Sequence, residues 1–275
     1  MGELHRTNYF SDSRSESRHV LLHYHTFKNA GTSVDAILSN CFGDEFMSVD
    51  GPVPEFFINQ TEVNVMIRNR AQVKAFSSHQ IRLPVPLDPR IEYLPIIFIR
   101  RPELRVQSMW RFQRSRADSH PATKLAKELD FREWIRFHLD ERRHASLLNQ
   151  QTRLFSFQYD QRTPVNHPEI LDLAIDNIQA LPFVGIVEHF EASMNIYRRL
   201  FQHLVPELVF ETLPQLNRSS QGYQPVREEM ARIERELGSG LFAELTERMH
   251  QDLELYERCC SAFDRQKRNL LDEAT

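Results

Sequence analysis

The chain has 275 residues, 41% of them hydrophobic, and a formal net charge of −4. This length and apolar content suffice for one α/β domain, which we expect over residues 19–260 between a disordered tail at 1–18 and a polar tail at 261–275. The acidic balance excludes a general nucleic-acid binder, because binding to a phosphate backbone needs a marked basic excess. Any anion site in this chain must therefore be local.

The cysteines and the apolar runs indicate the compartment. Cys41, Cys259 and Cys260 fit no metal-ligand spacing, and an adjacent pair is not a disulfide framework, which favours a reducing environment. Residues 1–18 lack the apolar core of a signal peptide, and no apolar run approaches the roughly 20 residues of a membrane helix. We therefore expect a cytoplasmic protein without a membrane span, and the sequence leaves its oligomeric state open.

The first third of the chain alternates apolar runs with turn signals and amphipathic segments. His79 falls just beyond a predicted strand end, where prolines then forbid regular structure. The elements expected here are, in order, a strand at 20–24, a polar turn at 25–33, a helix beginning near Gly31, an irregular connection at 41–60, a weak helix at 61–70 and a short strand at 73–77.

The rest of the chain continues this alternation. The continuously apolar run at 95–99 is typical of a central parallel strand, and it ends in Arg100 and Arg101. The pattern as a whole predicts an α/β fold in which helices flank a central parallel sheet. The elements expected are a strand at 95–99, a helix at 102–114, helical segments over 122–158, a helix at 168–181, a strand at 183–187, a helix at 190–203, a polar loop at 213–220 and helices at 225–237 and 240–258.

Two strand ends carry groups suited to anions. A helix beginning near Gly31 directs free N–H groups and its positive dipole end into the preceding loop, where Lys28, Thr32 and Ser33 add a charge and two hydroxyls. The loop is not a Walker A sequence, because Lys28 precedes the glycine. The strand at 95–99 ends in two arginines where a nucleotide triphosphatase would need a carboxylate for Mg²⁺. The sequence therefore predicts two anion pockets and no metal.

These two stretches resemble the donor-binding motifs of sulfotransferases. Residues 28–33 (KNAGTS), preceded by His25, are similar to the 5′-phosphosulfate loop HxPKTAGTS, and residues 99–102 with Arg105 and Ser108 are similar to the 3′-phosphate motif FVRDPxERxxSxY. The resemblance continues through residues 78–79, 149–153 and 183–190, and it is greatest to the carbohydrate-type branch. Phe27, Asn29 and Arg101 depart from the family pattern, but backbone N–H groups supply much of a phosphate loop.

The resemblance implies a P-loop-like three-layer α/β fold and a reaction. The donor would be 3′-phosphoadenosine 5′-phosphosulfate, and its sulfuryl group would pass in line, without a metal, to a hydroxyl of a small-molecule or glycan acceptor. Lys28 would stabilise the leaving group and His79 would act as general base. The residues predicted to bind the donor are Lys28, Asn29, Ala30, Gly31, Thr32, Ser33, Arg100, Ser108, Asn217, Arg218 and Ser219.

Several alternatives stay open at this point. The chain can also be interpreted as a small-molecule kinase that needs Mg²⁺ and ATP, or as a nucleotide-binding module without turnover. His25 competes with His79 for the role of base, whereas His23 is expected to pack in the sheet. Arg101 can equally face solvent, and residues 217–220 can equally form a solvated turn. The acceptor is expected to contact the loops at 41–60, 80–94 and 114–124.

Overall fold

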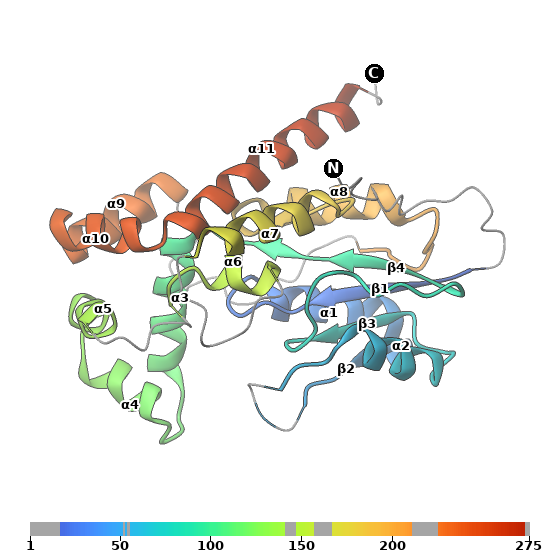
Figure 1. Cartoon of the computed structure of the whole chain (residues 1–275), viewed down its shortest axis with the longest axis horizontal. Helices are drawn as coiled ribbons and strands as arrows, with labels where there is room; N and C mark the ends of the chain where they lie inside the picture. Colours follow the sequence, from blue (N-terminus) through green and yellow to red (C-terminus); the bar gives the residue numbers. More distant parts are fainter. Residues whose placement is uncertain are drawn as a thin grey trace.

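The computed structural model describes residues 17–51, 53, 56–140, 147–156, 167–210 and 225–272. A parallel sheet of four strands with the order β2-β3-β1-β4 forms the centre of the molecule, and helices flank it (Figure 1). The fold is therefore α/β with a central parallel sheet, as the sequence predicted. The strands of this sheet are β1 (Arg18–Tyr24), β2 (Phe46–Ser48), β3 (Ala75–Ser78) and β4 (Ile91–Ile96).

The apolar run predicted as one strand at 95–99 is divided between two sheets. β4 begins earlier than the sequence pattern predicts, pairs with β1 up to Ile96, and is followed by β5 (Phe98–Ile99), which pairs instead with β6 (Gly185–Ile186). Gly185 has no room for a side chain, because a Cβ there would lie 2.5 Å from the Phe98 ring. The predicted strand at 95–99 therefore spans a change of partner at Ile97.

The helices follow the predicted order. α1 packs against the strands that precede and follow it, and α8 and α11 pack against β6. The helices are α1 (Gly31–Phe42), α2 (Gln60–Arg68), α3 (Pro102–Ser115), α4 (Pro121–Glu128), α5 (Phe131–Asp140), α6 (Gln150–Phe155), α7 (Pro168–Gln179), α8 (Phe190–Phe201), α9 (Val226–Leu237), α10 (Ser239–Arg248) and α11 (His250–Asp272), with short 3₁₀ turns η1 (Gly43–Glu45) and η2 (Val187–His189).

Two hydrophobic clusters form the core. The larger one surrounds the strands, α1, α7 and α8. The smaller one is built by α3, α4, α5, α9 and α10 around the fully buried Trp134 and Phe131, and it occupies the left side of Figure 1. Because α3 begins directly after β5, this helix carries the chain from the sheet into the second cluster.

Some boundaries differ from the sequence predictions. β2 lies inside the stretch expected to be irregular, and α11 continues through the predicted C-terminal tail as far as Asp272, with Phe263 buried. The three cysteines are free. Among the described helices, none has both the length and the apolar composition to cross a membrane. The predicted donor contacts Asn217, Arg218 and Ser219 lie outside the described residues.

Candidate functional site

Among the described residues, no hydrogen-bond acceptor is assigned to several amide N–H groups of the loop between β1 and α1. Lys28 and Ala30 adopt left-handed backbone conformations, with φ of 65° and 62°. Within the described ranges, no acceptor is assigned to the amide N–H groups of Lys28, Ala30, Gly31 or Thr32. Alternating left- and right-handed residues before a helix form a concave nest of N–H groups that suits an anion. The loop therefore has the backbone of an anion site although it contains a single glycine.

Asn29 fastens this loop to the neighbouring strand. Its buried side-chain amide donates to the carbonyl of Phe98 (2.9 Å) and to Oε1 of Gln151 (2.8 Å), and its backbone N–H donates to Thr26 (3.2 Å). Gln151 also accepts from the backbone N–H of Arg100 (2.9 Å) and donates to its carbonyl (2.8 Å). Asn29 therefore holds the loop in place, and its own donors are already used by the protein.

The loop and the arginine that follows β5 lie together. Arg100 donates from Nη1 to the carbonyl of Lys28 (3.1 Å), and its Nε lies 3.9 Å from Glu188. Lys28 makes no ion pair with any described residue, and its ammonium lies 4.4 Å from the centre of the Phe112 ring. Burial, and secondly the charge of Arg100, lowers the pKa of Lys28. Two cations of which one lacks a counter-charge favour an anionic ligand between them.

Phe27, which departs from the family pattern, connects the loop to the second hydrophobic cluster. Its ring meets Phe112 of α3 edge-on, with the ring centres 5.6 Å apart, and it packs against that cluster. An aromatic pair in this geometry is worth about 0.5–1.5 kcal/mol beyond the area it buries. Phe27 thus anchors the loop through its aromatic ring, which a proline at this position could not do in the same way.

The residue at position 31 must be a glycine because the His25 ring packs against it. A Cβ on Gly31 would lie 2.0 Å from the imidazole of His25, closer than any real contact of such an atom. The imidazole therefore packs directly on the first residue of α1. This contact places His25 against the same helix N-terminus that is suited to bind an anion.

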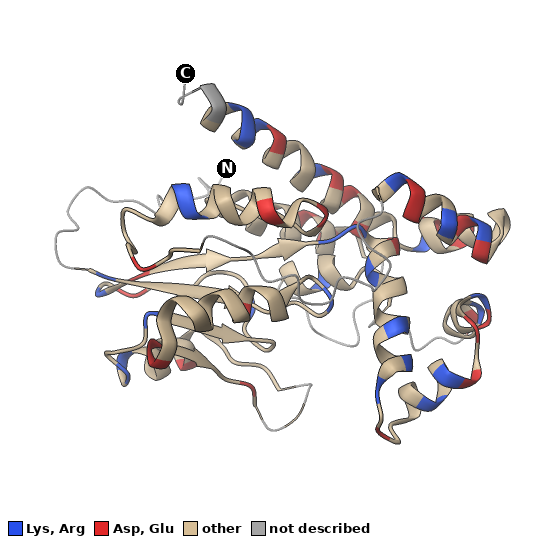
Figure 2. Ribbon diagram, turned by 180° about the vertical axis from the view of Figure 1, so that it is seen from behind, with Lys and Arg blue, Asp and Glu red and all other residues tan. Residues whose placement is uncertain are grey.

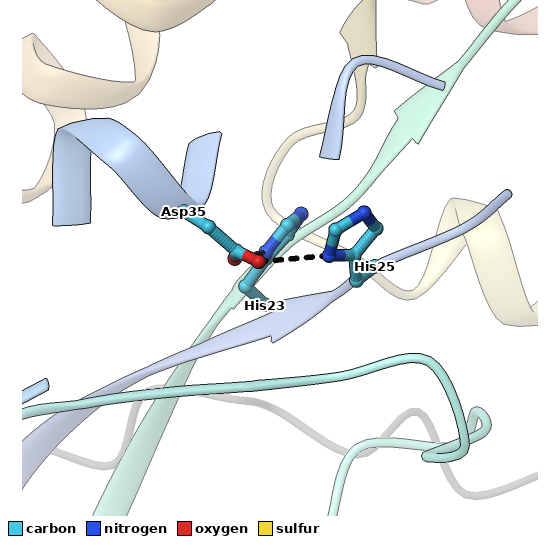
Figure 3. Close-up of side chains that lie close together, drawn as sticks. All are labelled: His23, His25 and Asp35. Atoms are coloured by element: carbon cyan, nitrogen blue, oxygen red, sulfur yellow. Dashed lines mark hydrogen bonds and ion pairs between the residues drawn. The ribbon is translucent and has the colours of Figure 1, made fainter. Parts of the chain in front are cut away.

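A half-buried carboxylate on α1 holds two histidines (Figure 3). Asp35 lies 2.7 Å from Nδ1 of His23 and 2.8 Å from Nδ1 of His25, and Ser77 also contacts His23 Nδ1 at 2.9 Å. Burial alone would raise the pKa of Asp35, but the hydrogen bonds from the two histidines outweigh it and the pKa is strongly lowered. Burial lowers the pKa of His23 to about 4, against the effect of Asp35. The cluster is thus an ionised carboxylate beside a neutral, buried His23.

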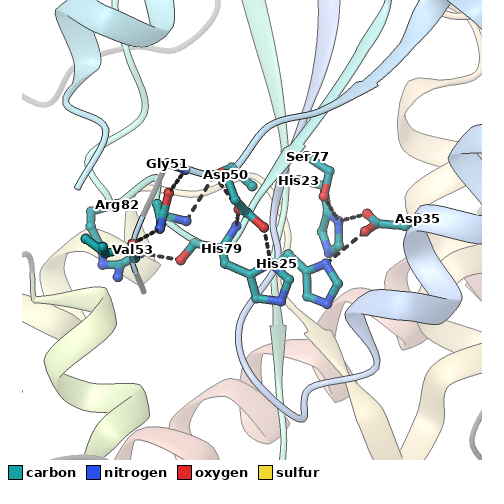
Figure 4. A network of polar contacts seen from close by, with 11 residues as sticks. His23, His25, Asp35, Asp50, Gly51, Val53, Ser77, His79 and Arg82 are labelled. Carbon is teal, nitrogen blue, oxygen red and sulfur yellow. Dashed lines mark hydrogen bonds and ion pairs between the residues drawn. The ribbon is translucent and has the colours of Figure 1, made fainter. Parts of the chain in front are cut away.

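His79 continues this array on its other side (Figure 4). Its ring stacks on that of His25, with the centres 3.8 Å apart and the planes inclined by 24°. Asp50 accepts from both Nδ1 (3.1 Å) and the backbone N–H (2.9 Å) of His79. Partial burial, followed by the charge of His25, lowers the pKa of His79, and Asp50 opposes this. A neutral imidazole with a side chain that is 43% exposed is suited to accept a proton.

His23, His25 and Asp35 are residue types that can bind a metal ion. His23, His25 and Asp35 each offer a ligand atom, and these atoms lie within 4.8 Å of one another. Both Nδ1 atoms are already hydrogen-bonded to the carboxylate, so the donor set is satisfied internally. The geometry is that of a carboxylate that orients two imidazoles.

The chain is similar in sequence to known proteins along most of its length. The model of a family described as the sulfotransferase family matches residues 11–257. The chain belongs to the sulfotransferase family. An uncharacterized protein of Archaeoglobus fulgidus is 30% identical over 255 residues, which cover 90% of this chain and 98% of that protein. Membership of this family supports sulfuryl transfer in general.

In this sulfotransferase-family protein, α3 presents a further predicted donor contact. Ser108 is half-buried and stands one helical turn before Phe112, so it lies on the face of α3 that carries the ring beneath Lys28. At the start of α1, Thr32 is exposed and Ser33 is buried. These hydroxyls therefore differ in access to a ligand.

The two remaining arginines of the second motif have protein partners. Arg101 lies 3.3 Å from the buried carboxylate of Glu103, and its backbone N–H donates to Glu188 (3.1 Å). Arg105 is fully buried and donates to the carbonyl of Leu147 (2.8 Å), and burial lowers its pKa to about 10. The Arg105 guanidinium therefore ties α3 to the segment before α6.

Sequence reasoning missed three polar residues that organise the site. Asp35 holds two histidines, Asp50 holds one, and Gln151 joins Asn29 to Arg100. Asp35 was detectable as a carboxylate on the first turns of a helix that follows a histidine-rich strand. Asp50 gave no local signal, because its contact depends on the pairing of β2 with β3.

Proposed function

We propose that this protein transfers a sulfuryl group from 3′-phosphoadenosine 5′-phosphosulfate to an acceptor hydroxyl without a metal. The observation that carries the proposal is that the Arg100 guanidinium contacts the backbone of Lys28 beside loop N–H groups that have no acceptor among the described residues, next to a neutral histidine. Such an arrangement supplies the positioning and the electrostatic stabilisation on which transfer of this kind depends.

The donor would bridge the two strand ends. In this proposal the 5′-phosphosulfate lies against residues 28–33 and the helix N-terminus, and Arg100 with Ser108 holds the 3′-phosphate. Asn217, Arg218 and Ser219 remain predicted contacts on the adenosine side. Asn29 contributes through the loop that it fixes, because its own donors are occupied. Lys28 is suited to stabilise the charge that builds on the departing phosphate oxygen.

His79 is the proposed general base. As the acceptor oxygen forms its bond to sulfur, its proton passes to Nε2 of His79, and the bond from sulfur to the phosphate oxygen breaks with its electron pair leaving on that oxygen. The lowered pKa of His79 keeps the imidazole neutral near neutral pH. His25 is less suited to this step, because its side chain is 12% exposed and packs on Gly31.

The proposed acceptor is a carbohydrate hydroxyl, a choice that rests on the resemblance to the carbohydrate-type branch. The segment after Asp50 carries the exposed side chains of Phe56 and Phe57, and the Phe56 ring packs over Gly51. These apolar side chains lie on the same segment as the residue that holds His79.

Donor recognition is tested by calorimetric titration with 3′,5′-adenosine bisphosphate and with 5′-AMP. We expect a strong preference for the bisphosphate, and loss of that preference in Arg100→Ala. Lys28→Ala should weaken binding of both ligands at least about 10-fold, because it removes a partly desolvated charge. Arg265→Ala, on the distal part of α11, is the matched control. Equal affinity for the two ligands would refute the donor assignment, and Mg²⁺-dependent ATP turnover would favour a kinase.

Transfer itself is tested with labelled donor and a panel of glycans, phenols and peptides. The expected result is label on a glycan, independent of added chelator and abolished in His79→Ala with bisphosphate affinity retained. Tight bisphosphate binding without transfer to any class of acceptor would instead favour a nucleotide-binding module.

A further inference from the structure

The segment after β2 places a carboxylate beside the proposed base. β2 pairs with β3 in a register that sets Ser48 opposite Ser77, and Val49 then donates its N–H to the carbonyl of Ser77 (3.0 Å). Continued for two residues, this register brings Asp50 opposite His79. The contact between Asp50 and His79 therefore follows from the pairing of β2 with β3.

Asp50 contacts the segment of the histidine at several points. Its Oδ1 accepts from the backbone N–H of His79 (2.9 Å) and from the hydroxyl of Ser78 (3.3 Å), while its Oδ2 faces Nδ1 of the ring (3.1 Å). Beyond it, Gly51 and Val53 are hydrogen-bonded to the side chain of Gln80. One carboxylate thus fixes both the backbone and the ring of His79.

This contact determines which ring nitrogen carries the proton. An ionised carboxylate can only accept, so the Nδ1 that faces it must be the N–H, and the lone pair of the neutral ring is then on Nε2. Free histidine favours the opposite tautomer. We propose that Asp50 is a positioning residue that holds His79 in the Nδ1–H tautomer with Nε2 available as the base, an inference that rests on the proposed function.

One face of the His79 ring is held as well. His25 stacks on His79 and is itself hydrogen-bonded to Asp35 (2.8 Å), so the ring plane is set from two sides (Figure 4). Arg82 donates to the carbonyl of His79 (2.8 Å) and fixes the chain just after it. Among the described residues, the charged and titratable groups around His79 include Asp50, His25, His23, Asp35 and Arg82.

An amide in place of the carboxylate should reverse the tautomer. In Asp50→Asn, the side-chain oxygen is retained where it accepts from the backbone N–H of His79, so the NH₂ group faces Nδ1. A donor at that position stabilises an unprotonated Nδ1 and moves the ring proton to Nε2, which removes the base. Where the orienting carboxylate of a catalytic histidine is changed to an amide in serine proteases, kcat falls by about 10⁴. We expect a loss on the order of 10²–10⁴ here.

The experiment reads the tautomer directly, by long-range ¹H–¹⁵N correlation spectra of histidine-labelled full-length protein. His79 is assigned by its absence in His79→Gln. We expect the Nδ1–H form in the wild type, the Nε2–H form in Asp50→Asn, and a mixture in Asp50→Ala. Asp44→Asn, an exposed aspartate just before β2, is the matched control and should resemble the wild type.

Two further readouts separate positioning from loss of structure. Bisphosphate affinity and the thermal midpoint should be retained in Asp50→Asn, while kcat for transfer falls with little change in the donor KM. An unchanged His79 tautomer in both Asp50 variants would overturn the inference. The tautomer measurement needs no acceptor, so it decides the role of Asp50 even where the screen for sulfuryl transfer fails.

Discussion

Replacing His23 with asparagine should make the free energy of unfolding less sensitive to acid. The imidazole is buried, with 1% of its side chain exposed, and Nδ1 lies between Asp35 and Ser77. Burial lowers its pKa from 6.5 to about 4, although the hydrogen bond to Asp35 acts in the opposite direction. An asparagine amide can donate to Asp35 from the position of Nδ1–H, but it binds no proton in this range.

The magnitude follows from the two pKa values. As the pH falls, the unfolded chain binds a proton near its ordinary pKa of about 6.5 while the folded chain does not, so the folded state becomes relatively less stable. This loss of stability ends near the pKa of His23 in the folded state, about 4. The difference of about 2.5 between the two values corresponds to about 3 kcal/mol. Asp35, whose folded pKa is lowered, adds its own loss of stability as the pH falls through its ordinary pKa of 3.8 and below.

The assay is urea unfolding of the wild type and His23→Asn at a series of pH values from about 7 down to about 4.5. The wild type should lose about 2–3 kcal/mol more than the variant over this interval, although the smaller side chain lowers the variant's stability at neutral pH by about 1–2 kcal/mol. His203→Asn changes an exposed histidine and should follow the wild type. Parallel curves for the wild type and His23→Asn would refute a neutral, buried His23.

Two other substitutions examine how the loop between β1 and α1 is held. Gly31→Ala should displace His25, because the new methyl group would lie 2.0 Å from its ring, and we expect bisphosphate affinity to fall by about 10-fold or more, measured by calorimetry. Gln151→Leu should remove the link between Asn29 and Arg100 and leave buried donors unpaired, at about 1–3 kcal/mol for each lost partner, measured by urea unfolding.

The controls for these substitutions lie nearby in the chain. Gly240→Ala places a methyl group in open space on α10, so it should change neither stability nor affinity appreciably. Gln179→Leu, at the end of α7, alters a glutamine that makes none of these contacts. Full bisphosphate affinity in Gly31→Ala would contradict the packing of His25 on the loop, and wild-type stability in Gln151→Leu would contradict the role of Gln151 as a link.

The elements that the sequence predicted well have local causes. The apolar run before Lys28 and the turn ending at Gly31 mark a strand, a loop and a helix by their own composition, and Pro102 marks the start of α3. The position of His79 after a strand end was also predicted and is confirmed. Its role as base stays a prediction.

The features that escaped prediction depend on distant contacts. β2 has three residues, half-buried or exposed, and becomes a strand only because β3 lies beside it. The change of partner at Ile97 is set by β6, almost ninety residues later in the chain. Asp50 and Gln151 act through partners that no local spacing reveals. Long-range register, and not local propensity, determines these parts of the site.

The contact between Phe27 and Phe112 gives the loop between β1 and α1 a double attachment. Phe27 seats one end of the loop in the helical cluster, while Asn29 ties the middle of it to the strand layer. A ligand held between Lys28 and Arg100 would bind a loop that belongs to both hydrophobic cores at once. Ligand binding should therefore strengthen the coupling between the two cores. With ligand bound, the cores should unfold more cooperatively and at a higher temperature.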